Sequence, residues 1–334
     1  MDLRSGALNL ITDVEGLRVG NAHDALVRSG VTVVLPESPA IAAVDVRGGA
    51  PGTRETDALA PTALVERIDA VVLSGGSAFG LEAASAVTTA LAAAGRGFPV
   101  GAVRVPVVPA AILFDLLDGG DKAWGESPPY SALGRAALAA AERSFDLGNA
   151  GAGFGARAGS LKGGLGSASA VSADGLEVGA LVAVNSHGET TMPGSSCFWA
   201  WALARPGEVG PQHPPTWPLP SDPPRYPSPM AGGHTSIGVV AANATLTRAE
   251  AQRVAIMAQD GLARAIRPVH TPFDGDTIFV LATARWELPA PRAETLLRIG
   301  AVAADCVARA VMRGIYAAEK LGEKLAYRDR FPNN

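Results

Sequence analysis

Ten prolines fall between Pro206 and Pro229, and no other feature restricts the possible folds of this chain as strongly. Proline lacks a backbone N–H and fixes φ near about −65°, so this stretch can form neither a helix interior nor a central strand. We therefore predict a long proline-rich loop over residues 204–231. The loop ends at two glycines and Thr235, and the apolar, β-branched run behind Thr235 predicts a strand.

The composition is that of a globular protein with a large core. With 334 residues, 48% of them apolar, the chain can form one large domain or two modest ones. A net charge of −4 gives no electrostatic support for a nucleic-acid partner. No signal peptide and no run of about 18 apolar residues is visible, so we expect a cytoplasmic protein without a membrane partner. Cys197 and Cys306 lie far apart without metal-ligand spacing, which predicts inert thiols and no metal site.

The hydrophobic pattern along the chain predicts a mixed α/β fold in which helices flank strands. Residues 31–35 and 40–46 are typical of the two strands of a β-hairpin, joined by a turn at 36–39. Further strands are expected at 70–73, 177–184, 237–242 and 277–282. Helices are expected at 78–94, 131–144 and 292–320, and also from the capping box at 247–250 to about residue 266.

The segment 148–166 is the part of the chain richest in glycine, and it allows two interpretations as a site. Gly164–Ser169 looks like the phosphate loop of the small-metabolite kinases of the galactokinase–homoserine kinase superfamily. The Walker spacing is absent, because Lys162 is followed by glycine rather than by Ser or Thr. Alternatively, Lys162 is a lone cation directed at another site, or simply a solvated lysine on the surface.

Several other polar residues stand at the ends of predicted strands. Asn185 follows the strand 177–184, where asparagine commonly serves a turn. Asp274 and Asp276 precede the strand 277–282, and they suit a metal site, an active site or a solvated turn. Tyr130 stands just before a predicted helix, where an aromatic residue usually packs against the core. Taken one at a time, each of these residues has an ordinary structural explanation.

Two segments in this order, HTSIGVVAANATLT from His234 and VHTPFDGDTIF from Val269, carry a resemblance to a known family. The chain resembles the self-cleaving family that includes L-aminopeptidase/D-Ala-esterase/amidase, β-peptidyl aminopeptidases and nylon-oligomer hydrolase. The blocks ITDVEGLRVGNA, AAVDVRGGAPGTRETD, VVLSGGSAFGLEAASAV, ALGRAAL and GAGFGARAG extend the resemblance over nearly the whole chain. It implies an αββα sandwich like that of N-terminal-nucleophile hydrolases, with a different connectivity.

The resemblance also implies what the polar residues do. Thr235 matches the nucleophile, and His234–Thr235 matches the bond that the protein cuts in itself. Asn185 matches the oxyanion-hole residue, and Tyr130 and Lys162 match residues that line the active site. The pair that would orient the nucleophile corresponds to Asp274 and Asp276.

The implied product is a single hydrolase domain cut into residues 1–234 and 235–334. The two chains stay together, and a homo-oligomer, a tetramer of processed heterodimers, is expected. The substrate would be a small peptide or amide. A free α-amino group titrates near about 7.7–8.0, so the amine of Thr235 can serve as general base for its own hydroxyl without a cofactor.

Two positions depart from the family pattern. The residue before the nucleophile is often Asn, where this chain has His234. The β-peptidyl aminopeptidases place a Glu that recognises the substrate amine where this chain has Ile112, with Asp115 as a substitute. Two alternatives therefore remain: a small-metabolite kinase using Gly164–Ser169, or an oligomeric scaffold of the same fold that never matures.

Overall fold

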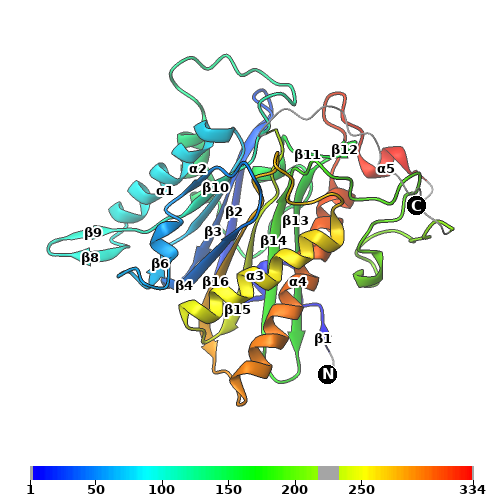
Figure 1. The fold of residues 1–334 in the computed structure, drawn as a ribbon. Helices are drawn as coiled ribbons and strands as arrows, with labels where there is room; N and C mark the ends of the chain where they lie inside the picture. The colour runs from blue at the N-terminus through cyan, green and yellow to red at the C-terminus, as the bar shows by residue number, and fades with distance from the viewer. Residues whose placement is uncertain (1–2, 217–232, 333–334) are drawn as a thin grey trace.

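The computed structural model describes residues 3–216 and 233–332, and these form four layers with two β-sheets face to face and helices outside (Figure 1). This arrangement confirms the αββα sandwich. The predicted loop at 204–231 is described only up to residue 216, so Trp217 and Gly232 lie outside the described residues. None of the described helices is long and apolar enough to cross a membrane.

The larger sheet contains both strands that follow Thr235 and Asp276. In spatial order, its seven strands are β1 (Leu3–Arg4), β13 (Gly164–Ser172), β14 (Glu177–Val184), β15 (Ile237–Ala244), β16 (Thr277–Trp286), β4 (Ala40–Val46) and β6 (Arg67–Ile68). Helices α3 (Arg248–Ala265) and α4 (Arg292–Ala317) cover its outer face (Figure 1).

The smaller sheet forms the second inner layer. Its five strands, in spatial order, are β2 (Leu17–Asp24), β3 (Ser29–Pro36), β7 (Val71–Ser74), β10 (Ala110–Ile112) and β5 (Thr53–Arg54). Helices α1 (Glu82–Ala93) and α2 (Tyr130–Ala139) cover its outer face (Figure 1). Outside the two sheets and these helices lie two small ribbons, β8 (Phe98–Val100) with β9 (Val103–Val105) and β11 (Arg157–Ala158) with β12 (Leu161–Lys162), the short helix α5 (Tyr327–Arg330) and several short 3-10 helices.

Strand β15 shows why the sequence behind Thr235 is apolar without interruption. Ile237 and Val239 pack into the core between the two sheets, whereas Val240 packs into the core under α3 and α4. Both faces of the strand are therefore buried, and alternation between apolar and polar residues is lost. β15 runs antiparallel to β14 and parallel to β16, with Ile237 opposite Thr277. The start of β15, the start of β16 and the end of β14 consequently meet at one edge of the sheet.

Most of the predicted elements are present, and the capping box is formed as predicted. The hydroxyl oxygen of Thr247 accepts a hydrogen bond from the backbone N–H of Glu250 (3.2 Å), and the Glu250 carboxylate accepts one from the backbone N–H of Thr247 (2.8 Å). Two predicted helix ends are too long: α2 ends at Ala139 rather than at residue 144, and α4 ends at Ala317 rather than at 320. Both predicted inert thiols, Cys197 and Cys306, are buried, and burial raises the pKa of each to about 11.

The predicted hairpin of residues 31–35 and 40–46 is wrong. β3 belongs to the five-stranded sheet and pairs with β2 and β7, whereas β4 belongs to the seven-stranded sheet and pairs with β16 and β6. The turn at 36–39 therefore crosses from one sheet to the other. Both strands are apolar on both faces because each lies inside the sandwich, so their pattern does not encode which sheet each one joins. The true hairpin partner of β3 is β2.

The kinase interpretation of Gly164–Ser169 is also wrong. These residues form no loop, because they lie inside strand β13 and pair along their length with β14. A Cβ atom on Gly166 would lie 1.9 Å from the backbone oxygen of Ala310 on α4. The glycines here let helix and sheet approach closely, and their backbone groups are used in the sheet.

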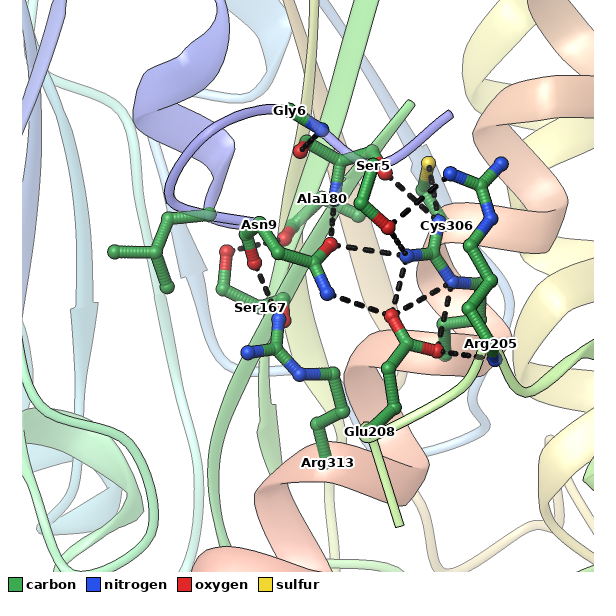
Figure 2. Close-up of polar contacts among 12 residues, drawn as sticks. Ser5, Gly6, Asn9, Ser167, Ala180, Arg205, Glu208, Cys306 and Arg313 are labelled. Atoms are coloured by element: carbon green, nitrogen blue, oxygen red, sulfur yellow. Dashed lines mark hydrogen bonds and ion pairs between the residues drawn. The ribbon is translucent and has the colours of Figure 1, made fainter. Parts of the chain in front are cut away.

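A buried ion cluster joins α4 to the start of the proline-rich loop (Figure 2). The guanidinium of Arg309 donates to both carboxylate oxygens of Glu208 (3.1 and 3.0 Å from Nε), and both side chains are almost wholly inaccessible. Ser5, Asn9 and the backbone oxygen of Ser169 accept its other N–H groups (3.0, 2.9 and 2.8 Å). The start of the proline-rich loop is thereby tied to the C-terminal third of the protein.

Candidate active site

Thr235 lies at the edge of the larger sheet where β15 begins. Only 2% of its surface is exposed, and its backbone N–H donates to the backbone oxygen of Asn185, just past the end of β14 (2.6 Å). On the other side, His234 pairs in parallel register with Asp274, just before β16. The sheet itself therefore brings Thr235, Asn185 and the aspartate segment together.

The backbone N–H of Gly275 is a hydrogen-bond donor to the Thr235 hydroxyl. It donates to the hydroxyl oxygen of Thr235 (3.1 Å) and to the carbonyl oxygen of His234 (3.2 Å). The Thr235 hydroxyl in turn donates to the same His234 oxygen. The hydroxyl is therefore held against the carbonyl that precedes it, and one N–H donor serves both oxygens.

A side chain at position 275 would disturb this arrangement. A Cβ atom there would lie 2.7 Å from the backbone oxygen of Ala50 and 2.8 Å from the Thr235 hydroxyl oxygen. Gly275 was not among the site residues expected from the sequence. Its place between two candidate acids at a strand entry is the signal that could have identified it, because a glycine lets the backbone approach a reacting group.

The two aspartates hold the loops around Thr235 and form no described contact with its hydroxyl. Asp276 accepts from the backbone N–H of Ser236 (2.8 Å) and from the backbone and ring nitrogens of His270 (3.1 and 2.9 Å). Asp274 accepts from the backbone N–H groups of His187 (3.2 Å) and Thr271 (3.0 Å). Burial raises the pKa of Asp274, and the nearby charge of Asp276 raises it further. No group of three or more His, Cys, Asp or Glu residues within 3–216 and 233–332 is arranged to hold a metal ion.

Asn185 contacts Thr235 through its backbone, and its side chain is fixed beside the site. The side-chain oxygen accepts from the backbone N–H of Arg157 (2.9 Å), and the side-chain nitrogen donates to the backbone oxygen of Phe114 (2.9 Å). An asparagine amide has two N–H donors, so one remains for another acceptor.

Lys162 is not a solvated lysine on the surface, because only 1% of it is exposed. Its ammonium donates to the backbone oxygens of Gly153 (3.1 Å) and Gly163 (2.8 Å), which leaves one of its three N–H donors. Burial lowers the pKa of Lys162 to about 7, against the opposing influence of two nearby aspartates. The lysine therefore changes charge near neutral pH.

Tyr130, Ser29 and Asp115 form a second buried polar group. Phe114, the residue before Asp115, connects this group to Asn185. The hydroxyl of Tyr130 donates to Ser29 (3.1 Å), whose own hydroxyl donates to Asp115 (2.7 Å). Burial raises the pKa of Tyr130, with a further contribution from the charge of Asp115, and burial raises the pKa of Asp115 as well. No described contact joins Tyr130 to Thr235.

Arg157 is a further charged residue at the site that the sequence analysis missed. Its guanidinium Nη2 lies 3.1 Å from Nε2 of the His234 ring. Burial, with further contributions from Arg157, His187 and Lys324, lowers the pKa of His234 to about 4. The ring is therefore neutral at pH 7, with Nε2 as acceptor and the proton on Nδ1. No pattern in the sequence marks Arg157, because its position across the β11–β12 ribbon from Lys162 is seen only in the structure.

Comparison with known proteins places this arrangement in context. The model of peptidase family S58 matches residues 9–326. An uncharacterized aminopeptidase of Mycobacterium tuberculosis (strain ATCC 25618 / H37Rv) is 43% identical over 97% of this chain and 98% of its own. A 6-aminohexanoate-oligomer endohydrolase of Kocuria sp. (strain KY2) is 29% identical over 92% of this chain and 85% of its own.

Solved structures agree with the fold. A β-aminopeptidase of Burkholderia sp. has a TM-score of 0.69 at 25% identity, and the match covers 98% of this chain and 93% of that one. The L-aminopeptidase D-Ala-esterase/amidase of Ochrobactrum anthropi, described as a new variant among the Ntn hydrolase fold, has a TM-score of 0.72 at 23% identity. That match covers 97% of this chain and 90% of the other.

Proposed function

Since the chain belongs to peptidase family S58 and is a hydrolase of peptide or amide bonds, we propose that it cuts itself between His234 and Thr235 and then uses Thr235 as its nucleophile. The proposal rests above all on the contacts of the Thr235 hydroxyl. This hydroxyl lies against the His234 carbonyl, and the Gly275 N–H is directed at both oxygens.

Maturation would proceed by an N-to-O acyl shift. The hydroxyl oxygen of Thr235 bonds to the carbonyl carbon of His234, the C–N bond breaks, and the hydroxyl proton passes to the departing amine. The Gly275 N–H stabilises the charge that develops on the His234 oxygen, a role in which one donor is worth about 100- to 1,000-fold in rate. Water then hydrolyses the ester, which leaves a carboxylate on His234 and a free amine on Thr235.

The same site would then act on substrates. The freed amine takes the proton of the Thr235 hydroxyl as it attacks, because its pKa of about 7.7–8.0 suits a base at neutral pH. The Asn185 backbone oxygen, which accepts from Thr235 nitrogen, would continue to hold this amine. Asp276 and Asp274 keep the surrounding loops in place, and Lys162, which changes charge near neutral pH, lies across the β11–β12 ribbon from Arg157. The remaining amide N–H of Asn185 would supply the second oxyanion donor.

The cut would leave two chains that cannot separate easily. Strands β15 and β16 belong to residues 235–334, and they lie between β14 and β4 of residues 1–234 in one continuous sheet. The Arg309–Glu208 pair adds a buried link between the same two fragments. We propose small peptides or amides as substrates, in line with the relatives, and a tetramer of such two-chain units as the assembly.

Substitution of Thr235 tests this function. We expect Thr235→Ala to abolish the hydrolysis of aminoacyl p-nitroanilides, and Thr235→Ser to keep both self-cleavage and hydrolysis. Thr235→Val keeps the branched shape without the hydroxyl and serves as the steric control. Wild-type protein that remains uncut and inactive on every amide would instead indicate an oligomeric scaffold of this fold.

A further inference from the structure

His234 occupies the position that the acyl part of a substrate must take. A single nucleophile, Thr235, attacks the His234 carbonyl during maturation and the substrate carbonyl afterwards. Both carbonyls must therefore reach the same hydroxyl and the same Gly275 N–H. After the bond is cut, the side chain of the substrate's acyl residue should therefore bind where the His234 side chain lies in the uncut chain. This argument rests on the proposed function.

The guanidinium of Arg157 lies beside the His234 side chain and has no anionic partner among the described residues. Arg157 is half-buried, and it forms no ion pair with any residue in the part of the chain that the structure describes. Its Nε is buried and has no hydrogen-bond partner within that same part. Its Nη2 is directed at Nε2 of His234. A partly buried guanidinium with unused donors binds a carboxylate strongly, because each such hydrogen bond is assisted by charge.

Two further cationic side chains, Lys324 and Lys162, lie near this guanidinium, and Asp118 is the acid paired with Lys324. Lys324, like Arg157, lowers the pKa of His234. The one ion pair described for Lys324 is a long one with Asp118 (3.6 Å). Lys162 stands across the ribbon from Arg157. Asp274 and Asp276, the two aspartates beside Thr235, already accept hydrogen bonds from backbone N–H groups of their own loop and of His187 and Ser236. The side-chain position of residue 234 is therefore bordered by positive charge.

We propose that Arg157 selects substrates whose acyl residue carries a carboxylate, and glutamyl amides above all. A glutamate carboxylate oxygen and histidine Nε2 are separated from their main-chain carbonyl carbons by the same number of covalent bonds. A glutamyl residue in the place of His234 thus brings its carboxylate oxygen to Arg157. A glutamine places a neutral oxygen there, and a lysine places a positive charge against Arg157.

The experiment compares the matured enzyme on four p-nitroanilides, those of Glu, Gln, Ala and Lys. We expect kcat/KM to fall in that order with Gln near Ala, and Glu to exceed Ala by about 10- to 100-fold, the value of charge-assisted hydrogen bonds. Arg157→Met should remove the preference for Glu while changing the rate on Ala by a few-fold at most. Arg253→Met, an exposed arginine on α3, is the matched control and should leave the order unchanged.

Maturation provides an independent readout in the intact chain. His234→Gln and His234→Glu should still cut, whereas His234→Lys should cut at least about 10-fold more slowly because its charge faces Arg157. Arg157→Met should also cut, as His234→Gln does, and a folded variant that remains uncut would contradict the role of Arg157 as a residue of substrate specificity alone.

Two further results would contradict the proposal in different ways. Equal kcat/KM for Glu and Lys in an enzyme that Thr235→Ala inactivates would overturn the role of Arg157 and leave the proposed function standing. Amide hydrolysis that survives Thr235→Ala, or its complete absence in the wild type, would overturn the proposed function and this inference with it.

Discussion

Replacing Glu208 with alanine should destabilise the protein more than almost any other change to a polar residue. The carboxylate accepts three contacts from the buried guanidinium of Arg309 and another from the side chain of Asn9 (2.7 Å) (Figure 2). In Glu208→Ala the guanidinium stays buried and keeps only neutral partners. Removal of one member of a buried ion pair costs about 3 to 5 kcal/mol in the free energy of unfolding.

The expected loss of stability arises because the charge of Arg309 stays buried without its partner, and a double-mutant cycle isolates this effect. Replacement of both members, Glu208→Ala with Arg309→Met, removes the orphaned charge and should restore part of the loss. Glu208→Gln keeps the shape and one acceptor, and we expect it to cost about 1 to 3 kcal/mol. Five proteins are compared by urea denaturation in the Thr235→Ala background: the parent, Glu208→Ala, Arg309→Met, their double variant and Glu208→Gln. All are measured at one protein concentration, so that neither self-cleavage nor assembly alters the comparison.

The pH dependence of the same pair has a definite sign. Burial alone would raise the pKa of Glu208, but the hydrogen bonds and charge of Arg309 outweigh it and lower the pKa. Stability from the pair is therefore fully present above the pKa of an unfolded glutamate and is lost as pH falls through the lowered value. Equal urea midpoints for Glu208→Ala and its parent at pH 7, or strictly additive losses in the double variant, would refute the reasoning.

Two further predictions concern the site. Gly275→Ala should slow self-cleavage by at least about 100-fold, because a Cβ would lie too close to the Thr235 hydroxyl oxygen (2.8 Å) and the Ala50 oxygen (2.7 Å). Cleavage is followed on denaturing gels, and a wild-type rate in a folded variant would contradict this prediction. Burial lowers the pKa of Lys162 from 10.5 to about 7. Between these pH values the lysine is protonated in the unfolded chain and neutral in the folded one. The free energy of unfolding should therefore rise with pH, by up to roughly 5 kcal/mol. Lys162→Met should abolish that rise, and urea titrations of both proteins at pH 7 and pH 10 would detect it.

The local structure around Thr235 was predictable because its causes lie within short segments. A run of β-branched and apolar residues behind two glycines predicts the strand that β15 forms, and the capping box at Thr247 predicts the start of α3. The layered sandwich was available only through the family resemblance. The pairing of β3 and β4 in separate sheets depends on contacts made far along the chain, and strands that are apolar on both faces carry no mark of their partner.

The sequence and the family resemblance named candidate site residues, but they did not indicate which atoms of these residues make the contacts. Thr235, Asn185 and Asp274 do meet at one edge of the larger sheet. The contact from Asn185 to Thr235, however, comes from its backbone, and a donor to the hydroxyl is the N–H of Gly275. Backbone donors leave no trace in residue type, so an inspection of polar side chains passes over them. Arg157 was missed because a lone arginine in a glycine-rich segment is ordinary until its partner is known.

The most direct test of self-cleavage is the N-terminal sequence of the smaller fragment, together with the intact masses of all chains in the purified protein. Our account predicts two chains, residues 1–234 and 235–334, with the smaller one beginning Thr235-Ser236-Ile237. Thr235→Ala should show one uncut chain. A wild-type protein that hydrolyses amides as a single uncut chain, or a cut at any other bond, would contradict the account.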